Sequence, residues 1–412
     1  MRALIATLIL AAGASFGSAF WMVFQDDGLA GPDVVAEAPA PEAPAPQPPA
    51  PQAPAPQTPA VAATKAEPAA RIVLASADTP ARAATTRAAT TRLDPLAALT
   101  EQRSPFPLAL PVDCMPGRDC WVINHVDLDP GPGRRDYRCG AMSYDGHKGT
   151  DIALRNLARL NDNVAVMAAA PGKVVGTRDG MADVSIAVAG KDAVKNRECG
   201  NGVRIQHADG WTTQYCHMKR GSIAVKTGQT VRTGQRLGSV GLSGMTEFPH
   251  VHITVEKDGK VVDPFRGIDG GPECGRGSAP LWDAEARREL VDEAPILVDA
   301  GFGAGPVQRT DAEAGTAALA ATGTDAPALV VWSRIAGIEP GDTLTTTIAG
   351  PDGASLFSDR WTADKTRIMQ FRYVGKKRPA GGWPAGTYTG RVLLERPGRA
   401  PHERTLSIRI GG

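Results

Sequence analysis

The chain has 412 residues, 42% of them hydrophobic, so it can build packed cores in two domains and is not a wholly disordered protein. Its 45 basic and 44 acidic residues give a net charge of +1, which offers no electrostatic basis for a nucleic-acid partner.

Residues 1–27 are predicted to be an export segment. After Arg2 the chain is uncharged over residues 3–24, roughly the length that spans a bilayer. Two interpretations remain open: a signal peptide cleaved near Ala19, or an uncleaved inner-membrane anchor with Trp21 at the far interface, which we favour. In both cases the rest of the chain is expected outside the cytoplasm, in the periplasm of the cell envelope.

Residues 28–107 are predicted to be a flexible linker. Eleven of the 34 prolines fall within residues 31–60, in runs such as APAPQPPAPQAPAPQTPA. Such runs favour extended polyproline II helix and cannot pack a core. We therefore expect a long arm that holds the following domain away from the membrane.

Residues 108–280 consist of short apolar runs separated by glycine-rich turns, which predicts an all-β domain. The runs HADGW and EKDGK each place Asp-Gly between strand-like segments, a strong hairpin signal. Residues 281–325 are predicted to contain a short helix over residues 283–293 and a polar linker. The strand-like runs of residues 326–412 predict a small Ig-like β-sandwich, with no catalytic cluster and no identifiable partner. The predicted fold class is mainly β.

All six cysteines lie in the predicted all-β domain, which suits an oxidising compartment and predicts disulfides. Six cysteines allow 15 pairings. We expect one pair across a hairpin, one local pair and one pair by elimination: Cys199 with Cys216, Cys114 with Cys120, and Cys139 with Cys274.

Two histidines flank one valine in the run PHVHITV. If this run is a strand, His250 and His252 point to the same side, because successive side chains of a strand alternate between its faces. The run GHKGTDIAL contains His147 and Asp151 in an H-x-x-x-D pattern that leads into a strand-like segment. These four side chains are candidates for one common site.

His217 ends the strand-like run TTQYCHM and is a fifth candidate. A second H-x-x-x-D pattern, formed by His125 and Asp129, runs into a Pro/Gly-rich loop, so we interpret His125 as a surface or packing residue. His207 and His402 have no comparable context.

A zinc site would explain this set of five candidates. Catalytic zinc usually takes three protein ligands, from imidazole or carboxylate groups, and keeps one position for water. Three of the five could therefore hold the metal, which leaves two to handle protons and charge. The sequence has no H-E-x-x-H run, which excludes the thermolysin arrangement.

The runs GHKGTDIAL, YCHM and PHVHITV, in this order and with glycine-rich GQ turns between them, resemble the lysostaphin/LytM-type zinc metalloendopeptidases that hydrolyse bacterial peptidoglycan. The resemblance covers about residues 140–266. It implies an all-β core, a duplicated hybrid motif with an open groove, one zinc ion per chain, and hydrolysis of peptide cross-links through a metal-activated water.

The resemblance also implies a role for each candidate. His147, Asp151 and His252 would hold the zinc, while His217 and His250 would act as general base or oxyanion stabiliser. Which of these two takes the proton stays open. The predicted membrane anchor and arm suit a periplasm, so the expected bonds join D-alanine to a diamino acid. The alternative is a non-catalytic protein that binds the wall or activates other wall hydrolases.

The sequence departs from the family pattern beside the site. Glu247 and Phe248 precede Pro249, where the family often has Thr-Gly or Ser-Gly. Cys216 and Met218 flank the middle histidine, where the family has a small residue and Leu. The first departure bears on substrate preference rather than on metal binding.

Overall fold

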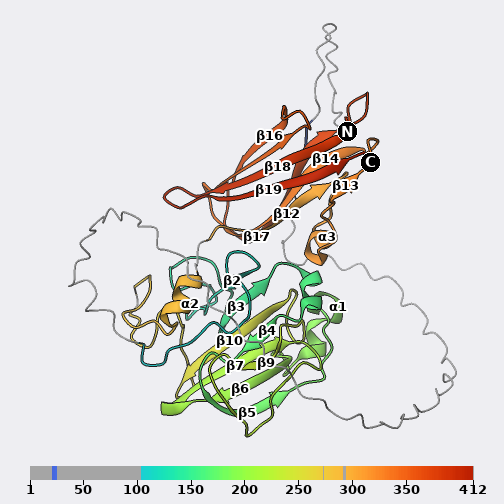
Figure 1. Cartoon of the computed structure of the whole chain (residues 1–412). Helices are drawn as coiled ribbons and strands as arrows, with labels where there is room; N and C mark the ends of the chain where they lie inside the picture. Colours follow the sequence, from blue (N-terminus) through green and yellow to red (C-terminus); the bar gives the residue numbers. More distant parts are fainter. Residues whose placement is uncertain (1–20, 26–103, 272, 291–293, 412) are drawn as a thin grey trace, which may run out of the picture. The chain divides into compact units, whose positions relative to one another are not determined.

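The computed structural model describes residues 21–25, 104–271, 273–290 and 294–411 (Figure 1). The described residues form mainly β structure, which confirms the predicted fold class. The predicted linker lies outside the described residues up to residue 103.

Only residues 21–25 of the predicted export segment are described. They form strand β1 (Trp21–Gln25), which pairs antiparallel with β17 (Arg367–Lys377). No helix within the described segments is long and apolar enough to cross a membrane.

The first β region contains an eight-stranded antiparallel sheet in which β10 lies between β3 and β7. The strand order is β2-β3-β10-β7-β6-β5-β8, with β11 paired to β10, and β4 and β9 form a separate two-stranded sheet. The strands are β2 (Cys120–Asn124), β3 (Thr150–Leu154), β4 (Ala165–Met167), β5 (Gly172–Arg178), β6 (Asn201–Gln206), β7 (Trp211–Met218), β8 (Thr230–Val231), β9 (Arg236–Ser239), β10 (His250–Lys257) and β11 (Lys260–Val261).

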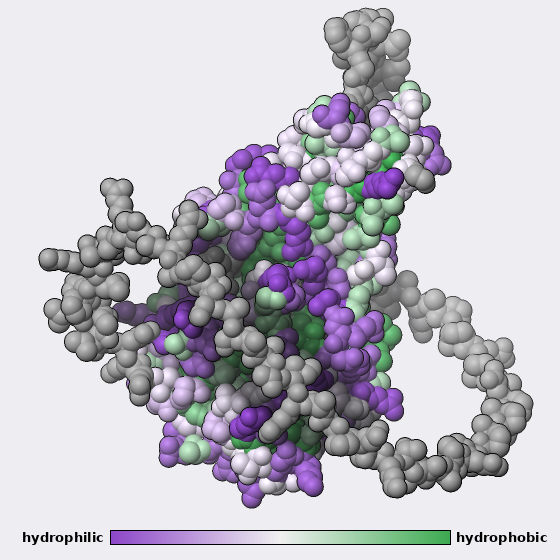
Figure 2. All heavy atoms as spheres, viewed as in Figure 1, coloured by the Kyte–Doolittle hydropathy of each residue, from purple (hydrophilic) through white to green (hydrophobic). Residues whose placement is uncertain are grey.

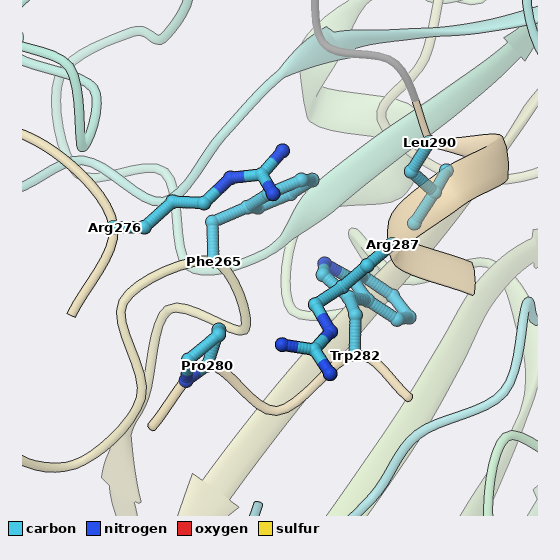
Figure 3. A pocket seen from close by; sticks show the side chains of 6 residues that line it. All are labelled: Phe265, Arg276, Pro280, Trp282, Arg287 and Leu290. Carbon is cyan, nitrogen blue, oxygen red and sulfur yellow. The ribbon is translucent and has the colours of Figure 1, made fainter. Parts of the chain in front are cut away.

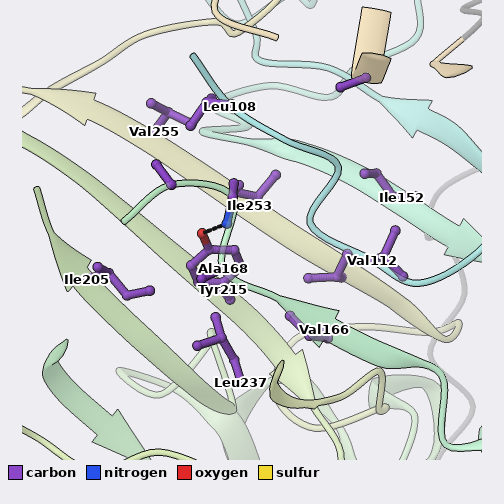
Figure 4. Close-up of a cluster of buried hydrophobic side chains, with 14 of the residues drawn as sticks. Leu108, Val112, Ile152, Val166, Ala168, Ile205, Tyr215, Leu237, Ile253 and Val255 are labelled. Atoms are coloured by element: carbon purple, nitrogen blue, oxygen red, sulfur yellow. Dashed lines mark hydrogen bonds between the residues drawn. The ribbon is translucent and has the colours of Figure 1, made fainter. Parts of the chain in front are cut away.

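Alternating side chains give the large sheet one apolar face. On β10, Val251, Ile253 and Val255 are buried in the hydrophobic core, so the residues between them face the other side of the sheet. Figure 4 shows this core, in which the Ala169 N–H donates a 2.8 Å hydrogen bond to the buried Tyr215 hydroxyl. The core thereby fixes which β10 side chains form the candidate site.

The two predicted Asp-Gly hairpins are present. Asp209 and Gly210 connect β6 to β7, and Asp258 and Gly259 connect β10 to β11. All four residues have positive φ, which Asp and Gly adopt more readily than most residues.

Short helices complete the first region. The predicted helix over residues 283–293 is α2 (Ala284–Glu289), and the Asp283 carboxylate accepts a hydrogen bond from the Ala286 N–H at its start. Ala286 and Leu290 are buried in the same core as the large sheet. The others are α1 (Ile186–Ala189), η1 (Leu157–Asp162), η2 (Lys191–Val194) and η3 (Ala208–Gly210).

The three predicted disulfides are confirmed: Cys114–Cys120, Cys139–Cys274 and Cys199–Cys216. The described residues contain no free cysteine.

The C-terminal β region consists of two sheets with a shared hydrophobic core, as predicted for a sandwich. One sheet has the order β1-β17-β14-β12, and the other has the order β13-β19-β18-β15-β16. The elements are β12 (Ile296–Gly303), α3 (Arg309–Ala314), β13 (Ala321–Thr322), β14 (Ala328–Ile338), β15 (Thr343–Ala349), β16 (Ser355–Thr362), β17, β18 (Gly386–Glu395) and β19 (His402–Ile410).

The structure differs from the predicted linker over residues 281–325. Strand β12 lies within that range and pairs with β14. Every residue of β12 is buried, so its sequence, ILVDAGFG, lacks the alternation that identifies a half-exposed strand.

A further cluster contains apolar residues from both β regions. It includes Trp121 and Ala153 of the first region and Ile296 and Ala336 of the second, with Phe248 packed against it. On the face shown in Figure 2, hydrophilic residues are interspersed with apolar ones.

Candidate metal centre

Strand pairing brings His252 and Asp151 together. His252 on β10 lies directly opposite Asp151 on β3, and both side chains are on the face of the sheet opposite the core. His250 lies two residues earlier on the same strand and therefore on the same face, as predicted. His147 enters from the loop that precedes β3.

Three potential ligand atoms converge at this point. The Nδ1 atom of His252 lies 2.8 Å from Oδ1 of Asp151, and Nε2 of His147 lies 3.2 Å from the same oxygen. The two imidazole nitrogens are 3.1 Å apart. Three ligands placed at 2.0–2.2 Å around tetrahedral zinc are separated from one another by roughly 3.3 Å. The three atoms therefore have the chemistry and the spacing that a zinc ion requires.

His217 reaches the site because of a β-bulge. On β7, Trp211, Thr213 and Tyr215 face the core, so strict alternation would turn His217 to the core as well. The register of β6 and β7 shifts instead: Met218 pairs with Asn201 and Tyr215 pairs with Val203. Between these two pairs, β7 has two residues and β6 has only one. With this extra residue and a φ of 60°, the His217 ring lies 4.6 Å from the His250 ring, centroid to centroid.

Hydrogen bonds fix which nitrogen each imidazole presents. Because a carbonyl oxygen only accepts, Nδ1–H of His147 donates to the His125 carbonyl at 2.6 Å, and Nδ1–H of His217 donates to the Ser243 carbonyl at 2.8 Å. Nδ1–H of His250 donates to the Phe248 carbonyl at 3.0 Å.

His252 uses its other nitrogen, since Nε2 lies 2.9 Å from Oγ1 of Thr254. In each of the four rings, one nitrogen is held by the protein and the other is available to the site.

The charge at the centre of the site comes from Asp151. Burial would raise the pKa of this carboxyl, but the imidazoles of His250 and His147 outweigh burial and hold the pKa well below its usual range. For His147, burial acts against the charged form, yet the nearby Asp151 carboxylate prevails and raises the pKa. Asp151 is therefore ionised at neutral pH, as a metal ligand must be.

Two other imidazoles are held neutral. Burial lowers the pKa of His217 well below its usual range, with a further contribution from His250. Burial also lowers the pKa of His252, although the hydrogen bond to Asp151 opposes it. Neutral imidazoles can act as metal ligands or accept protons.

The five predicted residues therefore lie together, but they offer two overlapping groups of metal ligands. One group is His147, Asp151 and His252; the other is His217, His250 and His252. Only the first contains a carboxylate, and its ligand atoms are all within 3.2 Å of one another.

The structure adds two neighbours that the sequence did not single out. The Tyr144 ring lies 4.3 Å from the His147 ring, and burial together with the Asp151 carboxylate raises the pKa of its hydroxyl, which stays protonated. The amide of Asn124 donates a hydrogen bond to Oδ2 of Asp151. Tyr144 lies three residues before His147, outside the run GHKGTDIAL, and Asn124 has no sequence signal.

The other histidines lie apart from the five. His125 is buried between Tyr137 and Phe265 and packs edge-on against both rings, in agreement with a packing role. A pocket occurs elsewhere in the first region, and none of the five candidates lines it (Figure 3).

Residues 145–264 match the family model described as Peptidase family M23, which confirms the predicted resemblance for this part of the chain. The cell division protein DipM of Caulobacter vibrioides is 33% identical over 121 residues, which is 28% of this chain and 18% of DipM. The peptidoglycan DD-endopeptidase ShyA of Vibrio cholerae is 39% identical over 67 residues, which is 16% of this chain and 15% of ShyA.

The matched part thus spans less than a fifth of these two relatives. Among solved structures, the catalytic domain of the antimicrobial peptidase lysostaphin from Staphylococcus simulans is 21% identical. That match covers 34% of this chain and 85% of the lysostaphin domain, with a TM-score of 0.22.

Proposed function

We propose that residues 108–280 form a zinc-dependent endopeptidase that hydrolyses peptide cross-links of bacterial peptidoglycan. The observation that carries the proposal is the convergence of His147, Asp151 and His252, whose ligand atoms lie 2.8–3.2 Å apart. The family match over residues 145–264 supports the same reaction class.

His147, Asp151 and His252 are the metal ligands of this proposal. A bound zinc ion supplies Lewis-acid chemistry, by polarising the scissile carbonyl and activating water. The ionised Asp151 balances part of the metal charge, and Thr254 and the His125 carbonyl orient the two ligand rings.

His217 and His250 handle protons and developing negative charge. Their Nδ1 atoms are held by backbone carbonyls, so each can use Nε2 toward the substrate. A neutral imidazole accepts a proton from the attacking water, and a protonated one donates to the oxyanion. The pH dependence of turnover in single variants assigns the two roles.

The substrate proposed is a cross-link between D-alanine and a diamino acid. ShyA, which is similar over 67 residues, is a peptidoglycan DD-endopeptidase. The three disulfides suit an oxidising compartment outside the cytoplasm, where cell-wall substrate is found. Of the two interpretations of the export segment, a signal peptide cleaved near Ala19 is the one compatible with strand β1, because residues 21–25 pair with β17.

The proposal is tested with purified chain and purified cross-linked peptidoglycan, by measuring bound zinc and identifying released muropeptides by mass spectrometry. Wild-type protein should release cleaved cross-links and lose activity when zinc is chelated. His250→Ala and His217→Ala should keep zinc and lose about 10²- to 10⁴-fold in turnover. His402→Ala, which changes a histidine on β19, is the matched control and should retain full turnover.

Bound zinc without cleavage of any cross-linked substrate would overturn the enzymatic proposal. That outcome would favour the non-catalytic alternative, a protein that binds the wall or activates other hydrolases.

A further inference from the structure

Asn124 stands directly beside the proposed metal ligand Asp151. Its Nδ2–H donates a 2.9 Å hydrogen bond to Oδ2 of the carboxylate. The exposed fractions of Asn124 and Asp151 are only 5% and 2%, so water does not substitute easily for this contact. Removing one partner from a buried hydrogen bond leaves the other unsatisfied, at an appreciable energetic cost.

A β-bulge turns Asn124 toward the site. On β2, Cys120 and Val122 face the core, so alternation alone would place Asn124 in the core as well. The pairing of β2 with β3 instead shifts between Val122 and Asn124, which puts Asn124 opposite Asp151. Bulges re-aim individual side chains, and they occur frequently next to active sites.

The two oxygens of Asp151 have separate partners. Oδ1 faces three imidazoles, at 3.2 Å from His147, 3.4 Å from His250 and 2.8 Å from His252. Oδ2 accepts the hydrogen bond from the Asn124 amide. A carboxylate held in this way offers one oxygen to a metal and keeps the second oxygen occupied.

We propose that Asn124 is a positioning residue that fixes Asp151 as a ligand through Oδ1 alone. This inference rests on the proposed zinc site. Without the amide, the carboxylate can rotate or bring both oxygens toward the metal. The second oxygen would then occupy the position needed by water or substrate. Loss of such a supporting hydrogen bond typically lowers metal affinity about 10- to 100-fold.

The test compares zinc affinity in the full chain and in Asn124→Leu, which keeps the approximate volume but lacks the amide donor. Affinity is measured by competition with a chromophoric chelator, and thermal unfolding of the zinc-free proteins reports folding. Asn124→Ala makes the same comparison if the leucine variant does not fold. We expect about 10- to 100-fold weaker zinc binding in either variant.

Asn156→Leu is the matched control. Asn156 makes the same kind of contact, an amide donating to a carboxylate, since its Nδ2–H lies 3.1 Å from Oδ2 of Asp299. The carboxylate of this pair is on β12 in the C-terminal region, and its other partners are the Ala300 N–H and Arg404, so its loss should reduce stability and leave zinc affinity at the wild-type value.

Cobalt substitution supplies a readout that a loss of stability alone does not change. The visible absorption of bound Co²⁺ should weaken in Asn124→Leu, because a carboxylate that binds through both oxygens raises the coordination number. If Asn124→Leu has the zinc affinity and the cobalt spectrum of the wild-type chain, the inference about Asn124 is overturned and the proposed function is not. A wild-type chain that binds no zinc would overturn both the proposed function and this inference.

Discussion

Two buried aspartates, one in each β region, have different kinds of partner. In the C-terminal region, Asp342 is paired with Arg396 at 2.7 Å, and the buried Arg372 is likewise paired with Asp359 at 3.0 Å. In the first region, the buried Asp151 has three imidazoles around one oxygen.

This difference separates a structural arrangement from a functional one. Paired buried charges compensate each other's loss of hydration, and an arginine partner donates hydrogen bonds but offers no lone pair to a metal. Several nitrogen lone pairs aimed at one carboxylate oxygen repel one another unless a proton or a cation lies between them. The first arrangement contributes to the fold, whereas the second is suited to binding a metal.

The largest effect should come from replacing Asp151 or Asp342 with alanine, in two separate variants. Asp151→Ala should weaken zinc binding well over 100-fold, more than loss of a supporting residue, because it removes a ligand atom. Asp342→Ala should leave zinc affinity unchanged and lower the free energy of unfolding by about 3 kcal/mol, because the Arg396 guanidinium loses its buried partner and keeps only Glu339 as a carboxylate partner, at 3.2 Å. Chelator competition and chemical denaturation measure the two quantities.

A loss of zinc affinity in folded Asp342→Ala, or wild-type affinity in Asp151→Ala, would show that the two buried aspartates do not differ in the way described.

Disulfide removal should affect only the first region, because the described C-terminal region contains no cysteine. The Cys139–Cys274 bridge spans a sequence separation of 135 residues, so replacing both cysteines with serine should cost about 5 kcal/mol. The Cys114–Cys120 bridge spans 6 residues and should contribute only about 2 kcal/mol. Differential scanning calorimetry should show a lower transition for the first region.

Equal destabilisation by the two serine pairs would contradict the dependence on loop length. A shift of the C-terminal region's transition by the same amount would contradict its independence from the disulfides.

The smallest effect is a pH dependence confined to the metal centre. Because Asp151 raises the pKa of His147, this ring binds a proton more readily than a free imidazole, and zinc competes with that proton. Zinc affinity should therefore fall as pH decreases from 8 through 6, by up to about tenfold per pH unit for one displaced proton. His252, whose pKa is lowered, should add to this fall only at lower pH.

Zinc titrations at three pH values measure this slope. A constant zinc affinity from pH 8 to pH 6 would contradict the assignment of His147 as a ligand.

Much of the fold follows from local patterns in the sequence. Alternation on β10 and the Asp-Gly turns at residues 209–210 and 258–259 predict strands and hairpins because they depend on residues close together in the chain. Strand β12 escaped prediction because it is buried on both faces and shows no alternation.

The sequence by itself determined the types of ligand and the shared face of His250 and His252, since a strand places residues two apart on the same side. The resemblance already included His217 in the site, but only the tertiary structure decided how His217 reaches it and that Asn124 joins it. Local alternation assigns both residues to the core, and each reaches the site through a bulge that exists only when its strand pairs with a neighbour. A bulge is a property of two paired strands, so no single run of sequence specifies it.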